Sequence, residues 1–405
     1  MIAGVLTLAA VALAQTPPAW QEPLDQHRWA EAETLLKRVL AEGETAPALS
    51  GLALVYRATG RIQEADPILE RLIQLDESAA NVEELARIKA GLGNLDRAEE
   101  LYRRALMLRG DIDPAESIAV HQRLSQVLVA EKKLTDAERE AAVAVSLRMR
   151  VAGQKNGDLA DDYAVLARIY EAEKNLQSAT RIWQTVAEIQ ADAFGYDSIR
   201  LADTLDSLAL CQYQLESVDE AVSSLRRALA IREINLGPSS AEVAHTADRL
   251  GIVLFNTKHY ADAEPFYRRA LDIFMMLEPG DPILARSYDN LAVTEAMLEK
   301  YDEAESLYRE SLKLRDGEDA IGLYNLAVLV ARRKPTEAEP LYARALAVLD
   351  APGNTNAELL KKVLTEYASL LRDLKRPAEA LKLEVRFNAG KPSPQPKAPP
   401  VPAKQ

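Results

Sequence analysis

The chain has 405 residues, of which 48% are hydrophobic and only 5% aromatic. Its formal net charge is −13 at neutral pH, and a surface of that sign repels nucleic-acid phosphates and anionic lipid headgroups. We therefore expect no nucleic-acid partner. The single cysteine, Cys211, excludes an intramolecular disulfide and a cysteine-cluster zinc site, and its place in an apolar stretch indicates a buried thiol.

The first 14 residues resemble a secretory signal peptide. They are apolar or small and end in Ala12-Leu13-Ala14 before Gln15, as a signal sequence does before its cleavage site. A run of this length is too short to span a bilayer as a helix, so we expect no integral membrane segment after its removal. The sequence thus predicts export to a periplasmic or extracellular location. No lysine or arginine precedes the apolar run, which leaves an uncleaved leader and a cytoplasmic protein as the alternative.

An alanine recurs in the same local context along the rest of the chain, at steps of 33 to 42 residues. A repeat of this length in a chain rich in helix formers predicts a solenoid of stacked helix pairs, whose product is a long surface. The recurring alanines are Ala32, Ala65, Ala98, Ala137, Ala179, Ala221, Ala263, Ala304, Ala338 and Ala380.

Two further positions keep register with this alanine. Eleven or twelve residues before it stands a small residue that follows a large apolar one, as in Leu85-Ala86 and Leu250-Gly251. Four residues after it stands a large residue, as in Tyr102 and Tyr267, with Ala141 as the exception. Small side chains let two helices approach to roughly 8 Å while large neighbours fill the flanking grooves. The pattern predicts an all-α solenoid of about ten antiparallel helix pairs.

The two ends of the solenoid differ from its middle. Residues 15–44 contain three prolines that leave room only for a short first helix, so we expect a degenerate N-terminal capping repeat there. The regular solenoid is predicted over 45–389. Residues 390–405 are rich in proline and are expected to form a disordered tail. That tail is interpreted either as a terminal extension without a role, or as a polyproline ligand or spacer.

Several helix starts are marked by their sequence. Ser239 to Glu242 and Asp113 to Glu116 have the spacing of a capping box, and Asp281-Pro282 places an N-cap residue before a proline.

The segment Leu85-Ala86, Gly93, Ala98, Tyr102 and Ala105 resembles the tetratricopeptide repeat. The units of about 42 residues between 158 and 315 are similar to kinesin light chain repeats. The resemblance implies a right-handed superhelix whose first helices line a concave groove. HEAT and armadillo repeats share this length and are the alternative, but they lack this register of alanine and tyrosine.

No catalytic or metal-binding pattern is found in the sequence. Its four histidines, His27, His121, His245 and His259, fall in different units without metal-ligand spacing. The sequence contains no glycine-rich phosphate loop, nucleophile elbow or zinc-protease motif, and the carboxylates follow the spacing of helix surfaces. We therefore expect no cofactor, no metal and no enzymatic activity.

The resemblance implies that ligands lie along the first helices, near the residue before the apolar leucine. Two asparagines occupy this position in consecutive units, and an asparagine amide both donates to and accepts from a peptide backbone. Nearby aromatics would anchor a side chain or pack between repeats, and the arginines would select acidic segments or be solvated. The candidate groove residues are Arg87, Arg123, Arg168, Tyr213, Arg249, Phe255, Asn290, Tyr324 and Asn325.

These observations predict a non-enzymatic scaffold that binds a protein or peptide partner in the groove. The alternative is a self-assembling structural solenoid of the cell envelope, because incompletely capped solenoids can stack end to end. The sequence leaves the identity of the partner and the oligomeric state open.

Overall fold

The computed structural model describes residues 17–110, 114–153, 157–277, 280, 282–351 and 356–389. The predicted signal peptide over 1–14 and the predicted tail over 390–405 lie outside these residues. Asp113 and Asp281, which the sequence analysis assigned to helix starts, also lie outside them.

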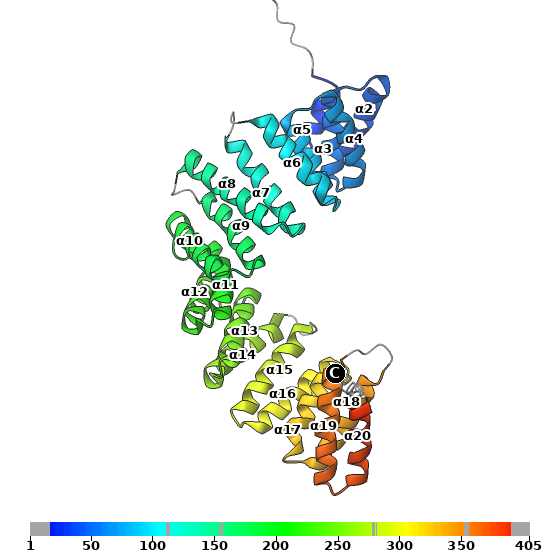
Figure 1. The fold of residues 1–405 in the computed structure, drawn as a ribbon, viewed down its shortest axis with the longest axis vertical. Helices are drawn as coiled ribbons and strands as arrows, with labels where there is room; N and C mark the ends of the chain where they lie inside the picture. The colour runs from blue at the N-terminus through cyan, green and yellow to red at the C-terminus, as the bar shows by residue number, and fades with distance from the viewer. Residues whose placement is uncertain are drawn as a thin grey trace, which may run out of the picture. The chain divides into compact units, whose positions relative to one another are not determined.

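The described residues form twenty α-helices and no strand (Figure 1). They divide into two compact units, Met1–Tyr196 and Asp197–Gln405, called here unit 1 and unit 2. The helices of unit 1 are α1 Gln21–Asp25, α2 Trp29–Glu42, α3 Ala46–Ala58, α4 Ile62–Leu75, α5 Ala79–Gly91, α6 Leu95–Arg109, α7 Pro114–Ala130, α8 Leu134–Ala152, α9 Asp158–Ala172 and α10 Leu176–Phe194. The helices of unit 2 are α11 Ile199–Gln214, α12 Val218–Leu236, α13 Ala241–Asn256, α14 Tyr260–Leu277, α15 Pro282–Met297, α16 Tyr301–Leu314, α17 Ala320–Ala331, α18 Pro335–Leu349, α19 Ala357–Asp373 and α20 Pro377–Ala389.

Each odd-numbered helix packs against the even-numbered helix that follows it, as α11 does with α12 and α13 with α14. Within each unit, the second helix of a pair then packs on the first helix of the next pair, as α12 does on α13. These ten pairs confirm the predicted all-α solenoid. The side that the odd-numbered helices of a unit present away from their partners is called here the first-helix face.

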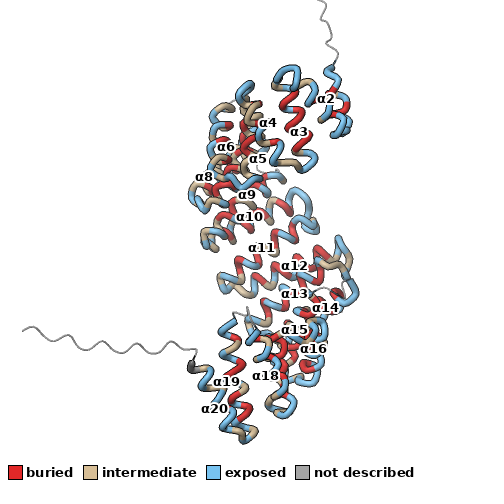
Figure 2. The backbone as a smooth tube through the Cα atoms, turned by 90° about the vertical axis from the view of Figure 1, so that its right-hand side faces the viewer, coloured by how far each residue is buried: buried red, intermediate tan, exposed pale blue. Residues whose placement is uncertain are grey.

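The recurring alanine lies where the two helices of a pair cross. All ten of these alanines are fully buried, and the small residues opposite them are buried as well. Figure 2 shows buried positions recurring along one helix after another. The approach is close at Gly251, where an added Cβ would lie 2.8 Å from the ring of Tyr267. The predicted helix crossing is therefore the packing contact that recurs throughout unit 1 and unit 2.

In nine of the ten described pairs, the turn places one residue in the left-handed region, five positions before the recurring alanine; the pair α17–α18 is the exception. The first pair has His27 there, and the second and third pairs have glycine, Gly60 with φ +73° and Gly93 with φ +80°. Later pairs use a charged residue instead, such as Lys174 with φ 62° and Lys258 with φ 65°. A residue with a Cβ is strained in this conformation by roughly 1–2 kcal/mol.

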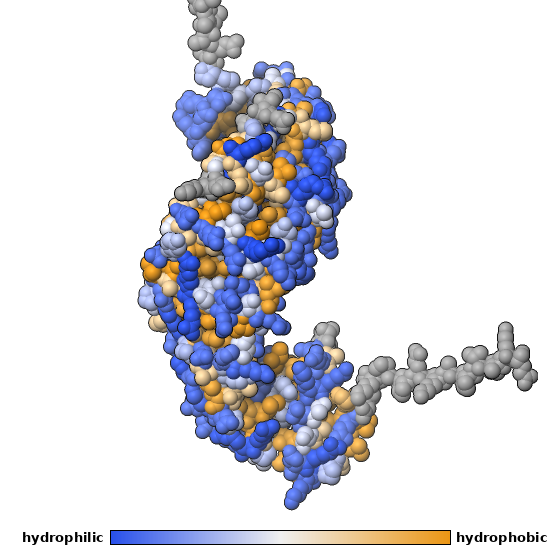
Figure 3. Space-filling view, turned by 60° about the vertical axis from the view of Figure 1, so that its left-hand side comes forward, coloured by the Kyte–Doolittle hydropathy of each residue, from blue (hydrophilic) through white to orange (hydrophobic). Residues whose placement is uncertain are grey.

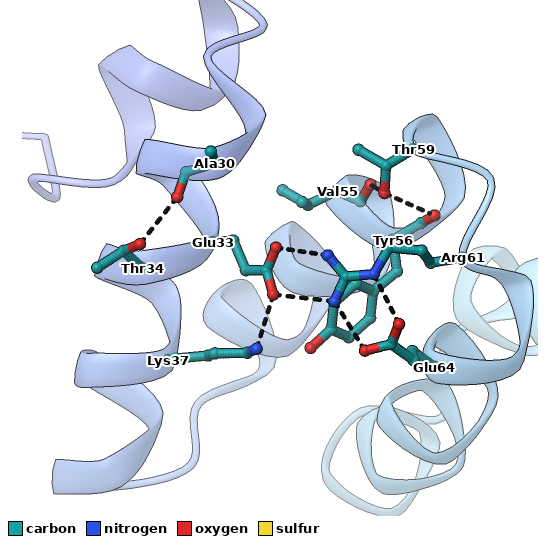
Figure 4. Close-up of polar contacts among 9 residues, drawn as sticks. All are labelled: Ala30, Glu33, Thr34, Lys37, Val55, Tyr56, Thr59, Arg61 and Glu64. Carbon is teal, nitrogen blue, oxygen red and sulfur yellow. Dashed lines mark hydrogen bonds and ion pairs between the residues drawn. The ribbon is translucent and has the colours of Figure 1, made fainter.

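Ion pairs join the second helices of neighbouring pairs within a unit. The carboxylate that directly follows the recurring alanine meets the cation just before the second helix of the next pair. In Figure 4, Glu33 lies between Lys37 of its own helix and Arg61, with oxygen to nitrogen distances of 2.6 Å and 2.7 Å. The same contact recurs as Glu99–Lys133, Glu264–Lys300, Glu305–Lys334 and Glu339–Arg376.

One predicted helix start is wrong by a residue. The N-cap of α13 is Ser240, whose Oγ accepts from the backbone N–H of Val243 at 3.3 Å, and not Ser239. The helix begins at Ala241, so Ser239 stands one position too early to reach an unpaired N–H of its first turn.

None of the described helices combines the length and the apolar character needed to cross a membrane.

Candidate functional site

A pocket of about 370 Å³ opens between α11 and α13 in unit 2. Leu210 and Tyr213 from α11 and Ile252 from α13 form its apolar wall, and Leu225 of α12 adds to its lining. Asp206 and Arg249 stand at its polar rim. An apolar concavity with a few polar groups at its edge is the usual form of a binding site for a side chain.

Leu210 and Ile252 are exposed although they are large and apolar. Their exposed fractions are 54% and 37%, whereas the small residues before them, Ala209 and Gly251, are buried. They stand one residue past the helix crossing, where the side chain points away from the partner helix. The fold does not need an apolar residue there, because that position contributes little to the core.

The same register carries an apolar residue in four consecutive pairs of unit 2. Val293 of α15 is half-buried, and Val328 of α17 is 40% exposed. Figure 3 shows that exposed apolar side chains, drawn in orange, interrupt the polar surface. We call Leu210, Ile252, Val293 and Val328 the apolar row.

The matching register of unit 1 is mostly polar. It holds Arg87, Gln126 and Arg168, with Leu54 as the apolar exception. A smaller pocket of about 160 Å³ lies between α7 and α9, lined by Gln126 and Arg168 among others. The first-helix faces of the two units therefore offer different chemistry.

The polar rim of the unit 2 site is held by contacts between neighbouring first helices. Asp206 of α11 pairs with Arg249 of α13 and with Arg232, whose Nη2 lies 2.8 Å from Oδ2. One pair further along, Asn290 of α15 donates from Nδ2 to Asp248 Oδ1 of α13 at 3.1 Å. In both cases an aspartate on one first helix accepts a hydrogen bond from the next first helix. The donor is the residue directly before the apolar leucine, Arg249 or Asn290.

The carboxylate of Asp248 is nearly buried. Burial raises its pKa above the usual range for aspartate, and the hydrogen bond from Asn290 opposes this rise. The side chain of Asn290 is therefore engaged in stabilising a buried acid.

Three of the predicted arginines lie in unit 1. Arg87 pairs with Glu84 on its own helix, and Arg123 pairs with Glu83 of α5. Arg168 is exposed and lies over the ring of Trp183, with its guanidinium carbon 6.0 Å from the ring centroid.

The predicted aromatic residues lie apart. Tyr213 lines the pocket and Phe255 does not, since Phe255 packs on Tyr260 with ring centroids 5.2 Å apart. Tyr324 contacts Tyr342 edge to face at 6.4 Å. Of the nine predicted groove residues, the pocket brings together only Tyr213 and Arg249.

Asn325 is partly exposed, and its side-chain amide has no hydrogen-bond partner among the described residues. Its amide stays available to a ligand, in contrast to that of Asn290.

Sequence reasoning missed Leu210 and Ile252 as site residues. The available signal was an apolar residue directly after the small residue of the crossing, repeated through four pairs of unit 2 and largely absent from unit 1. No group of three or more His, Cys, Asp or Glu side chains in the described part of the chain is arranged to hold a metal.

Three models described as tetratricopeptide repeat match this chain. Together they cover residues 22–81, 83–112, 160–234, 236–316 and 291–357. These matches take in well over half of the sequence. The chain belongs to the tetratricopeptide repeat family.

Solved structures of this family resemble the chain in fold. RapI in its apo form is 14% identical, with 91% of this chain and 95% of RapI covered and a TM-score of 0.52. The C-terminal part of a TPR repeat-containing protein from Cytophaga hutchinsonii is 15% identical, with 68% and 96% covered and a TM-score of 0.51. A putative kinesin light chain from Podospora anserina with nearly identical TPR-like repeats is 18% identical, with 50% and 96% covered and a TM-score of 0.45.

No curated protein matches the sequence. Tetratricopeptide repeats generally serve as scaffolds for protein interactions.

Proposed function

We propose that this tetratricopeptide repeat protein is a non-enzymatic scaffold that binds a protein or peptide on the first-helix face of unit 2. The observation that carries the proposal is the apolar row, whose members Leu210 and Ile252 line the pocket and stay exposed. Each Å² of such apolar surface that a partner covers would stabilise the complex by about 25 cal/mol, so covering the row favours association.

The polar surroundings suit an extended segment. Asn325 offers an unengaged amide beside the apolar row, and an amide can pair with both the N–H and the C=O of a peptide backbone. Arg249 remains 55% exposed on its side chain although it pairs with Asp206, so it can also donate to a ligand oxygen such as a backbone carbonyl. Asn290 is proposed to hold the binding face in shape through its hydrogen bond to Asp248 of the neighbouring first helix.

The proposal is tested by recovering partners from an extract of the native host with the full-length protein. The double substitution Leu210→Glu and Ile252→Glu places two charges in the apolar contact and should lower the recovered partner at least tenfold, which corresponds to about 1.4 kcal/mol. The matched control is Ile234→Glu on α12, a residue that is 67% exposed on a second helix. Unchanged recovery with the folded double variant would reject this face as the binding surface.

A smaller loss of partner binding is expected from Asn325→Ala. Losing one uncharged hydrogen bond should weaken binding by roughly 1 kcal/mol, or about fivefold.

We also propose that the protein is exported. The support is the apolar run over 1–14 that ends in small residues. The mass of the protein purified from its host tests this, because retention of Met1 would overturn the proposal.

A further inference from the structure

Unpaired carboxylates line the edge of unit 2 next to Tyr213. Tyr213 lies in the last turn of α11, and the exposed residues Glu216, Asp219 and Glu220 follow within the turn and the start of α12. Asp262 stands at the start of α14, near the exposed Lys258. Among the described residues these four carboxylates form no ion pair, so this edge of the binding face is negative.

The apolar row places one side chain on each of four successive first helices, and the contact of Asn290 with Asp248 shows that α13 and α15 lie side by side. Packed helices lie roughly 8–10 Å apart. A polyproline II helix repeats every three residues over about 9 Å and presents the same face at each repeat. Grooves with an aromatic wall bind such segments, and Tyr213 supplies that wall here.

The chain itself contains a segment of this kind. Residues 390–405 follow directly after α20, the last helix of unit 2. Pro396, Pro399 and Pro402 are spaced by three residues, and the segment carries three lysines and no aspartate or glutamate. At about 3.1 Å per residue it reaches up to roughly 50 Å, which is enough to span several helix pairs.

We propose that residues 392–402 dock on the apolar row of unit 2 in the same molecule as a polyproline II segment. The prolines at intervals of three meet successive members of the row, and Lys397, the one lysine of this segment, faces the negative edge. This inference rests on the proposed function, since it uses the same face. It names the class of ligand as a proline-rich, lysine-bearing extended segment, and an external partner of that class competes with the chain's own residues.

The test uses the full-length protein with a photo-crosslinking amino acid in place of Val401. Irradiation is followed by separation of monomer from dimer and by mass spectrometry of the cross-linked peptides. We expect adducts in the monomer on residues of α11, α13 or α15. Leu210→Glu with Ile252→Glu should lower their yield at least fivefold, and alanine at Pro396, Pro399 and Pro402 should do the same. Ile234→Glu should leave the yield unchanged.

Three results would overturn the inference: adducts confined to second helices, adducts only in the dimer, or a yield insensitive to the double variant. These outcomes are distinct from failure of the proposed function. Loss of partner recovery without any adduct on the row would leave the scaffold proposal standing and remove the docked tail. Adducts on the row together with unchanged partner recovery in the double variant would leave the docked tail standing and reject the scaffold proposal.

Discussion

At the scale of single residues, side-chain size at one position decides how closely two helices approach. The recurring alanines are fully buried, and Gly251 faces Tyr267 where no added carbon fits. This register was predictable from the sequence because packing restricts size at the crossing in every pair. The exposure of Leu210 and Ile252 was not predictable in the same way, since an apolar residue in an apolar helix looks alike whether it is buried or exposed.

Gly251→Ala should destabilise unit 2 by roughly 1–3 kcal/mol, despite the better helix propensity of alanine. The new Cβ would meet ring atoms of the buried Tyr267 at 2.8 Å, which forces the ring or the helix to shift. Urea denaturation followed by circular dichroism measures the change. Gly91→Ala in α5 is the control, because nothing lies within 4 Å of its added carbon. Equal effects of the two substitutions would contradict the close crossing.

Lys174→Gly should stabilise the protein by roughly 0.5–1 kcal/mol. Lys174 has φ 62°, a conformation that glycine adopts without the strain a Cβ brings. The same substitution at Lys361, which is exposed within α19, should destabilise by about 1 kcal/mol through the lower helix propensity of glycine. Thermal unfolding of both variants gives the signs, and a loss of stability at position 174 would refute the strain.

At the scale of secondary-structure elements, ion pairs between neighbouring second helices fix the stacking of one pair on the next. Arg61 donates to Glu33 across the interface and to Glu64 on its own helix (Figure 4). The partners of Arg249 and Asn290 were missed in the sequence because Asp206 and Asp248 lie about one repeat earlier. Only the contact between first helices brings them together.

Glu33 makes the stability of unit 1 depend on pH in acid. Its hydrogen bonds from Arg61 and Lys37 lower its pKa from 4.5 to about 2 in the folded protein. A depressed folded-state pKa stabilises above the unfolded value, and this contribution is lost as the pH falls from about 4.5 toward 2. Glu33→Gln should therefore cost roughly 1–2 kcal/mol at pH 7 and progressively less below pH 4.5.

Urea unfolding of wild type and variant at a series of pH values checks this dependence. Glu31→Gln is the control, because Glu31 lies on the same helix as Glu33 but forms an exposed ion pair with Arg28. A difference between wild type and Glu33→Gln that stays constant down to pH 3 would show that the charge of Glu33 is not what stabilises the interface.

At the scale of the whole molecule, function depends on which face of each unit exposes apolar side chains that the fold does not bury. The all-α repeat architecture followed from the spacing of alanines, and the family matches agree with it. The location of the site did not follow, because an apolar residue beside a helix crossing is expected in the core, and only the structure shows that Leu210 and Ile252 of the apolar row are exposed.

The measurement that tests the account most directly is hydrogen exchange by mass spectrometry on the full-length protein, alone and with its co-purified partner. Amides in the helices that bear the pocket, α11 and α13, should exchange more slowly in the complex, while those of α12 and α14 should change little. Protection confined to the second helices, or to unit 1, would contradict the assignment of the first-helix face of unit 2 as the binding surface.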